Sequence, residues 1–148
     1  MAVFMDEFTL RACRYSDLGE ILTVEKAAFP DSPYNWFDFV YFLTRPGVGF
    51  TVAVMDERLV GYVIATGGVS HGTVQSIAVS PEFRRRSIGA ALMKSALEHL
   101  SKYERVYLLV ERNNVAAISL YHKFSFKETG KVKRGYYKNV NDAIEMVR

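Results

Sequence analysis

The chain has 148 residues, of which 49% are apolar and 24% are charged, as in ordinary soluble globular domains. This length supports one core, so we expect a single domain over residues 1–148. No apolar run approaches the roughly 20 residues that cross a bilayer, and acidic residues at positions 6 and 7 argue against a signal peptide. A net charge of +3 does not require a nucleic-acid partner.

The single cysteine, Cys13, excludes an internal disulfide and is compatible with a reducing cytoplasm. It lies in an alternating segment, so we interpret it as a small core residue and not as a nucleophile. We expect a cytoplasmic protein without a membrane partner, either a monomer or a homodimer.

The first half of the chain alternates strand and helix signals. Alternating polarity predicts a strand over residues 8–14. Ser16 is typical of a helix N-cap, and an apolar stripe predicts a helix that ends near Phe29. A Pro-containing break follows, and then a short aromatic helix over residues 35–44.

The rest of the chain continues this alternation as an α/β (α+β) protein. Strands are expected over 49–55 and 59–66, around a turn at 56–58. The remaining expected elements, in chain order, are a strand over 73–79, a helix over 87–103, a buried strand over 106–110, a helix over 114–124 and closing strands over 127–133 and 143–147.

Residues 76–93 carry the strongest chemical signal. An apolar strand runs into a Ser-Pro pair, a basic loop and a helix that starts with small residues. The first N–H groups of a helix have no intrahelical partner, and the helix dipole favours negative charge there. With Arg84, Arg85 and Arg86 beside them, these N–H groups predict a diphosphate seat. The alternative is a solvated arginine-rich surface.

This loop lacks the lysine of a P-loop and the three glycines of a dinucleotide fingerprint. It resembles the acetyl-CoA loop of the GCN5-related N-acetyltransferase (GNAT) superfamily, usually Arg/Gln-x-x-Gly-x-Gly/Ala, with Ser87 at the first Gly position. The element order also resembles that of GNAT proteins, over essentially the full length. The resemblance implies a mixed, mostly antiparallel seven-stranded sheet with splayed central strands and about four helices. It also implies that acetyl-CoA binds to Arg84, Arg85, Arg86, Ser87, Ile88, Gly89 and Ala90.

A second segment, residues 114–126, resembles the GNAT pattern Asn-x-x-Ala-x-x-x-Tyr before a Gly-Phe pair, with Ser125 replacing that Gly. The resemblance implies that Asn114 and Ala117 contact the cofactor and that Tyr121 lies near the thioester sulfur. A phenol has a pKa of about 10 and a thiol one of about 8.5, so Tyr121 can donate to a departing thiolate. The alternative is that Tyr121 only completes an apolar helix stripe.

The central strand of the GNAT fold corresponds to residues 75–79. By resemblance, the main chain of Ile77, Ala78 and Val79 meets the pantetheine and acetyl ends of acetyl-CoA. The carbonyl oxygen of an attacked thioester needs such a donor.

Among GNAT proteins, the chain most resembles the RimI-like ribosomal-protein alanine acetyltransferases and their archaeal relatives. This implies that the α-amine of a protein or peptide N-terminus attacks the thioester directly. The identity of the base stays open, because Leu109 and Thr73 occupy positions where bacterial and archaeal relatives have Glu and His. Asp31 matches a carboxylate of the loop between the first two helices, whereas Glu111 and His71 are weaker candidates.

The acceptor groove is expected between Phe29, Pro30 and Asp31 on one side and Tyr136 and Tyr137 on the other. Paired tyrosines can bond peptide carbonyls and exclude water. The alternative is that they cover a surface hairpin.

Two other functions compete with this interpretation. A small-amine acetyltransferase, acting on a polyamine, amino sugar or amino acid, needs an acidic pocket, and the sequence has no acidic run. A non-catalytic acetyl-CoA-binding module fits the two Gly-to-Ser changes but not the intact Tyr121. The sequence shows no cluster typical of a metal site, and nucleic-acid binding ranks last because no recognisable motif accompanies the basic residues.

Overall fold

The computed structural model describes residues 7–84, 87–136 and 141–148. Short 3-10 turns precede α1 and follow β4, at Tyr15–Asp17 and Pro81–Phe83. The helices and strands are β1 (Thr9–Ala12), α1 (Leu18–Ala28), α2 (Trp36–Thr44), β2 (Gly49–Met55), β3 (Arg58–Gly67), β4 (Gly72–Val79), α3 (Ile88–His99), β5 (Val106–Glu111), α4 (Val115–Lys123), β6 (Lys127–Lys133) and β7 (Ala143–Val147). Among these described residues, no helix is both long and apolar enough to cross a membrane.

Within the described residues, seven strands form one sheet in the order β1-β2-β3-β4-β5-β7-β6. β4 and β5 pair in parallel, and the other neighbours pair antiparallel. The predicted fold class is therefore confirmed, with its mixed, mostly antiparallel sheet and four α-helices in the described part of the chain.

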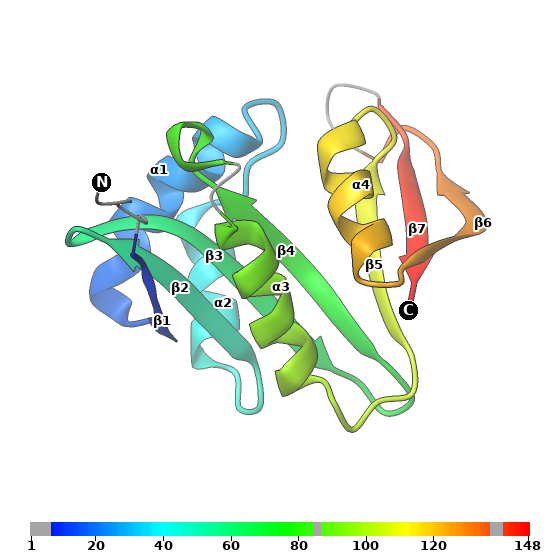
Figure 1. Cartoon of the computed structure of the whole chain (residues 1–148), viewed down its shortest axis with the longest axis horizontal. Coiled ribbons are helices and arrows are strands. Elements are labelled where there is room, and N and C mark those ends of the chain that lie inside the picture. The colour runs from blue at the N-terminus through cyan, green and yellow to red at the C-terminus, as the bar shows by residue number, and fades with distance from the viewer. Residues whose placement is uncertain (1–6, 85–86, 137–140) are drawn as a thin grey trace, which may run out of the picture.

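Two apolar cores lie on opposite faces of the sheet. One lies under α3 and α4 and includes Leu92, Tyr121 and Met146. The other lies under α1 and α2, where Phe39 packs edge-on against Tyr62 with ring centroids 5.4 Å apart. Figure 1 shows α3 and α4 in front of the strands and α1 and α2 behind them.

The sheet opens between its two central strands. β4 and β5 pair only from Gly72↔Val106 to Val74↔Leu108. The register between β3 and β4 shifts at the next residue, which leaves Gln75 as an extra residue in β4. Such a β-bulge bends its strand, so the bulge accounts for the divergence of β4 from β5 seen in Figure 1. The splay that the family resemblance implied is present.

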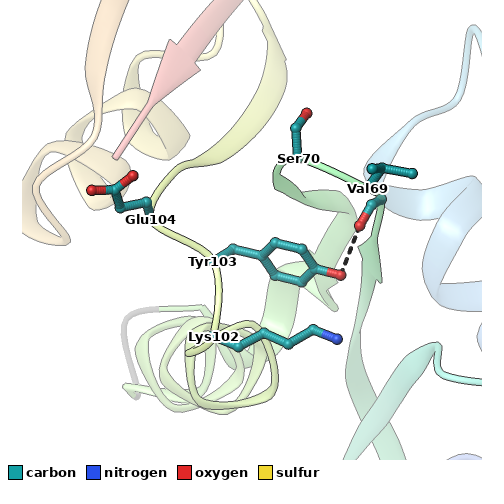
Figure 2. A pocket seen from close by; sticks show the side chains of 6 residues that line it. Val69, Ser70, Lys102, Tyr103 and Glu104 are labelled. Atoms are coloured by element: carbon teal, nitrogen blue, oxygen red, sulfur yellow. Dashed lines mark hydrogen bonds between the residues drawn. The ribbon is translucent and has the colours of Figure 1, made fainter.

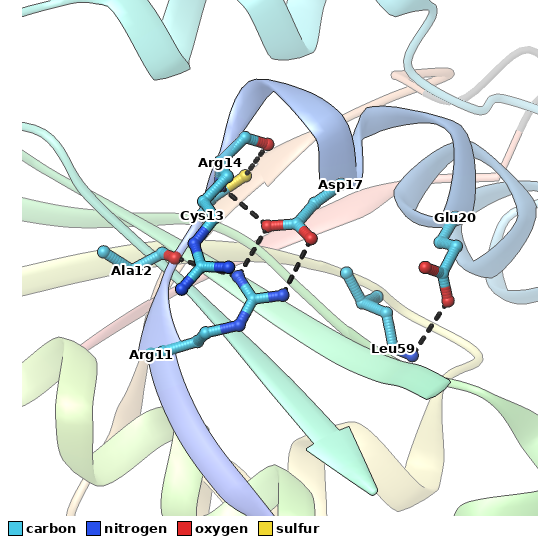
Figure 3. A network of polar contacts seen from close by, with 7 residues as sticks. All are labelled: Arg11, Ala12, Cys13, Arg14, Asp17, Glu20 and Leu59. Atoms are coloured by element: carbon cyan, nitrogen blue, oxygen red, sulfur yellow. Dashed lines mark hydrogen bonds and ion pairs between the residues drawn. The ribbon is translucent and has the colours of Figure 1, made fainter. Parts of the chain in front are cut away.

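The turn into α1 differs from the prediction. Ser16 is not the N-cap, because Asp17 holds that position. Instead of capping α1, the Asp17 carboxylate accepts two hydrogen bonds from Arg11, at 2.7 and 2.8 Å, and one from the Arg14 N–H (Figure 3). The bonds from Arg11 lower the pKa of Asp17, against the opposing effect of burial. A charged junction therefore fixes α1 to β1.

The third helix ends at His99 and not at residue 103. Beyond the helix, the Tyr103 hydroxyl donates to the Gly68 carbonyl at 2.9 Å, joining the α3–β5 connection to the β3–β4 turn. This contact borders a surface cavity of about 590 Å³ (Figure 2). The cavity lies at the end of β4 opposite the splay.

Candidate active site

A cavity of about 480 Å³ lies in the splay between β4 and β5. The two strands form its walls, α4 borders it on one side, and the loop that joins α1 to α2 borders it on the other. Its lining residues are Glu25, Phe29, Ser32, Tyr34, Thr73, Val74, Gln75, Ser76, Ile77, Leu108, Leu109, Val110, Glu111, Asn114, Ala117, Tyr121 and Tyr136.

The cavity brings together Ile77 from the first motif, Asn114, Ala117 and Tyr121 from the second, and two residues of the expected acceptor groove, Phe29 and Tyr136. Ala78 is not in the lining, because its side chain is buried in the core beneath α1 and α2. Pro30 and Asp31 are exposed and do not line the cavity, so their roles stay predictions. Arg85, Arg86 and Tyr137 lie outside the described residues.

The main chain of β4 presents polar groups to the cavity. The Ser80 N–H donates to the Val60 carbonyl at 2.8 Å, so Ser80 faces β3. Because main-chain direction alternates along a strand, Ile77 and Val79 face the opposite edge, where pairing with β5 has ended. The Val79 carbonyl accepts a bond from Arg84 Nε at 3.3 Å.

The start of α3 fits the predicted anion seat. Ser87 is the N-cap, and its side chain makes no capping bond. The amides of Ile88, Gly89 and Ala90 belong to the first turn, where N–H groups have no intrahelical acceptor. A Cβ added at Gly89 would lie 3.4 Å from Leu120 Cδ2, an ordinary contact that leaves room for a methyl group.

The two serines that replace family glycines both have left-handed backbones, with φ of 64° at Ser87 and 70° at Ser125. Ser125 follows α4 in a Schellman arrangement: its N–H bonds His122 O, and the Phe126 N–H bonds Tyr121 O, both at 3.0 Å. Glycine is the usual residue in this conformation because it has no Cβ to crowd the following carbonyl. Both serines therefore hold a strained backbone conformation.

We expect Ser125→Gly to stabilise the protein by about 0.5–1 kcal/mol. Relief of left-handed strain contributes roughly 1–2 kcal/mol, and the added freedom of unfolded glycine offsets about half of it. The free energy of unfolding in urea measures the change. Ser119→Gly, inside α4, is the matched control and should cost about 0.5 kcal/mol. Destabilisation by Ser125→Gly would contradict the strain assignment.

The two ends of α4 have structural as well as site roles. The Asn114 side-chain oxygen caps the helix by accepting from the Ala117 N–H at 3.1 Å, which leaves its amide nitrogen as the donor for a ligand. Tyr121 is only 6% exposed and packs against Phe126, with ring centroids 6.1 Å apart. It belongs both to the core and to the cavity wall.

Glu25 was missed by the sequence analysis and is the most deeply buried acid of the site, at 2% exposure. Its carboxylate accepts the Tyr34 N–H at 2.8 Å and the Tyr62 hydroxyl. Burial raises the pKa of Glu25, against the opposing effect of these two bonds. The signal was present in the sequence: Leu18, Ile21, Glu25 and Ala28 share one helix face, and a carboxylate in an apolar stripe needs partners.

Burial keeps two further side chains near this region, Cys13 and Tyr34, in their protonated forms. Cys13 packs against the core beneath α1 and α2, and burial raises the pKa of its thiol to about 12. The group therefore stays a thiol at neutral pH and not a nucleophile. Burial also raises the pKa of Tyr34 to about 12, so its hydroxyl stays protonated beside the cavity.

Comparison with known proteins decides the family. Residues 14–126 match the model of the Acetyltransferase (GNAT) family. This chain belongs to the GNAT family. Acetyltransferases with the GNAT fold use acetyl-CoA, and a crystal structure of the NatC complex bound to Gag peptide and CoA shares the fold, with a TM-score of 0.83 and 20% identity.

The GNAT relatives of this chain include named N-terminal acetyltransferases. It is 34% identical to an N-alpha-acetyltransferase of Saccharolobus solfataricus, over 96% of this chain and 93% of that relative. A putative ribosomal protein bS18-alanine N-acetyltransferase of Bacillus subtilis is 30% identical, over 93% and 92% of the two chains. The crystal structure of the ribosomal-protein-S18-alanine N-acetyltransferase from Escherichia coli matches with a TM-score of 0.84 at 25% identity, over 95% and 92%.

Proposed function

We propose that this GNAT enzyme acetylates the α-amine of a protein or peptide N-terminus with acetyl-CoA. The observation that carries the proposal is the cavity in the splay. It is lined both by the motif over residues 114–126, which is expected to bind acetyl-CoA, and by the loop between α1 and α2 (the acceptor loop), which is expected to bind the peptide. Asn114 and Tyr121 line this cavity together with Phe29 and Tyr136. The relatives named for N-alpha and ribosomal-protein alanine acetylation support the same acceptor class.

The residues present fit acetyl-CoA. Its pyrophosphate would be held by the first-turn amides of α3 and by Arg84, the described arginine of the basic loop. Its pantetheine arm would lie along the unpaired edge of β4 at Ile77 and Val79, within reach of the Asn114 amide. Acetyl-CoA supplies an acetyl group activated as a thioester.

Different groups of this chain would then orient the amine, stabilise charge and donate a proton. The acceptor amine enters between the acceptor loop and Tyr136 and reaches the carbonyl carbon at the splay. Main-chain donors on the open edge of β4 stabilise the negative charge that grows on the carbonyl oxygen. Tyr121 donates its phenolic proton to the departing sulfur. A nitrogen–carbon bond would form as the carbon–sulfur bond breaks, and the proton that the nitrogen then loses would restore the hydroxyl of Tyr121.

Asp31 remains a candidate carboxylate at the entrance, on the exposed part of the acceptor loop. We further propose a cytoplasmic location and a monomeric or homodimeric state. A single cysteine, Cys13, is compatible with a reducing compartment.

We expect Gly89→Leu to raise the Kd for acetyl-CoA at least tenfold, because a branched side chain beside Leu120 displaces the first turn that presents the amides. Isothermal calorimetry measures the change. Gly89→Ala is the matched control and should bind within twofold of wild type, since a methyl group fits. Equal Kd values for all three proteins would remove the start of α3 from the cofactor site.

A further inference from the structure

A chain of hydrogen bonds runs from the cavity wall to the buried carboxylate of Glu25. Ser76, on β4, lines the cavity, and its Oγ lies 2.7 Å from the hydroxyl of Tyr62 on β3. Tyr62 is fully buried, and its hydroxyl also bonds the Glu25 carboxylate on α1. Three elements thus join in one polar path through an otherwise apolar core.

The donors in this path have a defined direction. An ionised carboxylate only accepts, so the Tyr62 hydroxyl donates to Glu25. The Tyr62 oxygen then accepts from Ser76, whose proton is committed to that bond. The remaining lone pairs of Ser76 Oγ are left to accept a proton from a ligand in the cavity.

We propose that Ser76, Tyr62 and Glu25 form a relay that removes a proton from the acceptor's ammonium group before it attacks. This inference rests on the proposed function, because it assigns the path by which that function obtains a neutral amine. An N-terminal amine has a pKa of about 7.7–8.0, so roughly nine-tenths of it is protonated at pH 7 and cannot attack.

The proton balance of the relay is complete. The ammonium group gives one proton to Ser76 Oγ, which passes its own hydroxyl proton to the Tyr62 oxygen. Tyr62 passes its proton to Glu25, so an ammonium and a carboxylate become an amine and a carboxylic acid. Ser76 touches the substrate, whereas Tyr62 and Glu25 act through it.

The surroundings of Glu25 favour its taking a proton. Burial beneath β3 raises its pKa, and the negative charge of Asp38 on α2 acts in the same direction. The Tyr34 N–H and the Tyr62 hydroxyl act the opposite way by bonding the ionised form. A raised pKa makes a carboxylate a stronger proton acceptor.

The test compares Tyr62→Phe and Ser76→Ala with wild type, with kcat/KM for an N-terminal peptide measured at pH 7 and pH 9. Both variants should lose about tenfold at pH 7, because only the neutral tenth of the amine can then attack. The deficit should shrink to below about twofold at pH 9, where most of the amine is already neutral. The peptide Kd from calorimetry should stay within twofold of wild type for Tyr62→Phe, because Tyr62 lies behind Ser76 and does not touch the substrate.

Tyr103→Phe is the matched control, because it also removes a tyrosine hydroxyl bond, to the Gly68 carbonyl, at the opposite end of β4. It should keep the wild-type pH profile. Wild-type rates in Tyr62→Phe and Ser76→Ala, or an equal deficit at both pH values, would overturn the relay. So would a pH-dependent loss confined to Asp31→Asn, which would make Asp31 the base. Failure of the wild-type protein to acetylate any peptide would instead refute the proposed function itself.

Discussion

Replacing Tyr121 by Phe should lower kcat about 10²-fold while the Kd for acetyl-CoA stays within twofold of wild type. The aromatic ring and its edge contact with Phe126 survive the change, so α4 keeps its place in the core. Only the hydroxyl at the cavity wall is lost, and with it the proposed proton for the departing sulfur. Thiol release in steady state gives kcat, and calorimetry gives the Kd.

The same experiment distinguishes the proposed role of Tyr121 from simple packing. If Tyr121 only fills the apolar stripe of α4, Phe should serve as well or better, and kcat should remain at the wild-type value. A thermal midpoint measured alongside the kinetics shows whether the fold is intact. An unchanged kcat with a normal midpoint would remove Tyr121 from the mechanism.

Replacing Phe39 by Ala should cost about 3–5 kcal/mol of unfolding free energy, the usual effect of emptying a fully buried aromatic site. Phe39 has no exposed surface and makes edge contacts to Tyr62 and Tyr34, at centroid distances of 5.4 and 5.7 Å. It therefore supports both the proposed relay and the acceptor loop. Urea denaturation measures the loss.

Phe37→Ala is the control for Phe39→Ala, since Phe37 lies on the same helix but is 74% exposed. Its loss should change the unfolding free energy by less than about 0.5 kcal/mol. Equal effects of the two substitutions would mean that α2 does not pack as described. If Phe39→Ala remains folded, a raised KM for peptide with an unchanged acetyl-CoA Kd is expected, because the loosened loop lies on the acceptor side.

Local signals in the sequence predicted most of the fold. Asn35 was placed at the start of the second helix, and in the structure its side chain caps α2 by accepting the Asp38 N–H at 3.0 Å. The sequence favours Ser16 as the N-cap of the first helix, but Asp17 holds that position in the structure. The Asp17 carboxylate bonds Arg11 on β1 and does not cap α1. Residues 100–103 are predicted as helix but lie beyond α3, where Tyr103 bonds a carbonyl far away in sequence. The contact of Tyr103 is a tertiary one, which no local pattern records.

The site was predicted unevenly. Residues such as Asn114 and Tyr121 could be predicted because both belong to a family pattern with fixed spacing along one helix. The Glu25–Tyr62–Ser76 path could not, because it joins three elements whose proximity depends on the packing of α1 on the sheet. The bulge at Gln75 that opens the cavity also has no local sequence mark.

The central claim is that acetyl-CoA and a free N-terminus meet in the splay between β4 and β5. The most direct measurement is to incubate the full chain with acetyl-CoA and a peptide that has both a free α-amine and an internal lysine, and to locate the acetyl group by mass spectrometry. The account predicts acetyl on the α-amine, with about 10²-fold less product from Tyr121→Phe. Acetyl on the lysine alone, or no thiol release with any peptide, would contradict it.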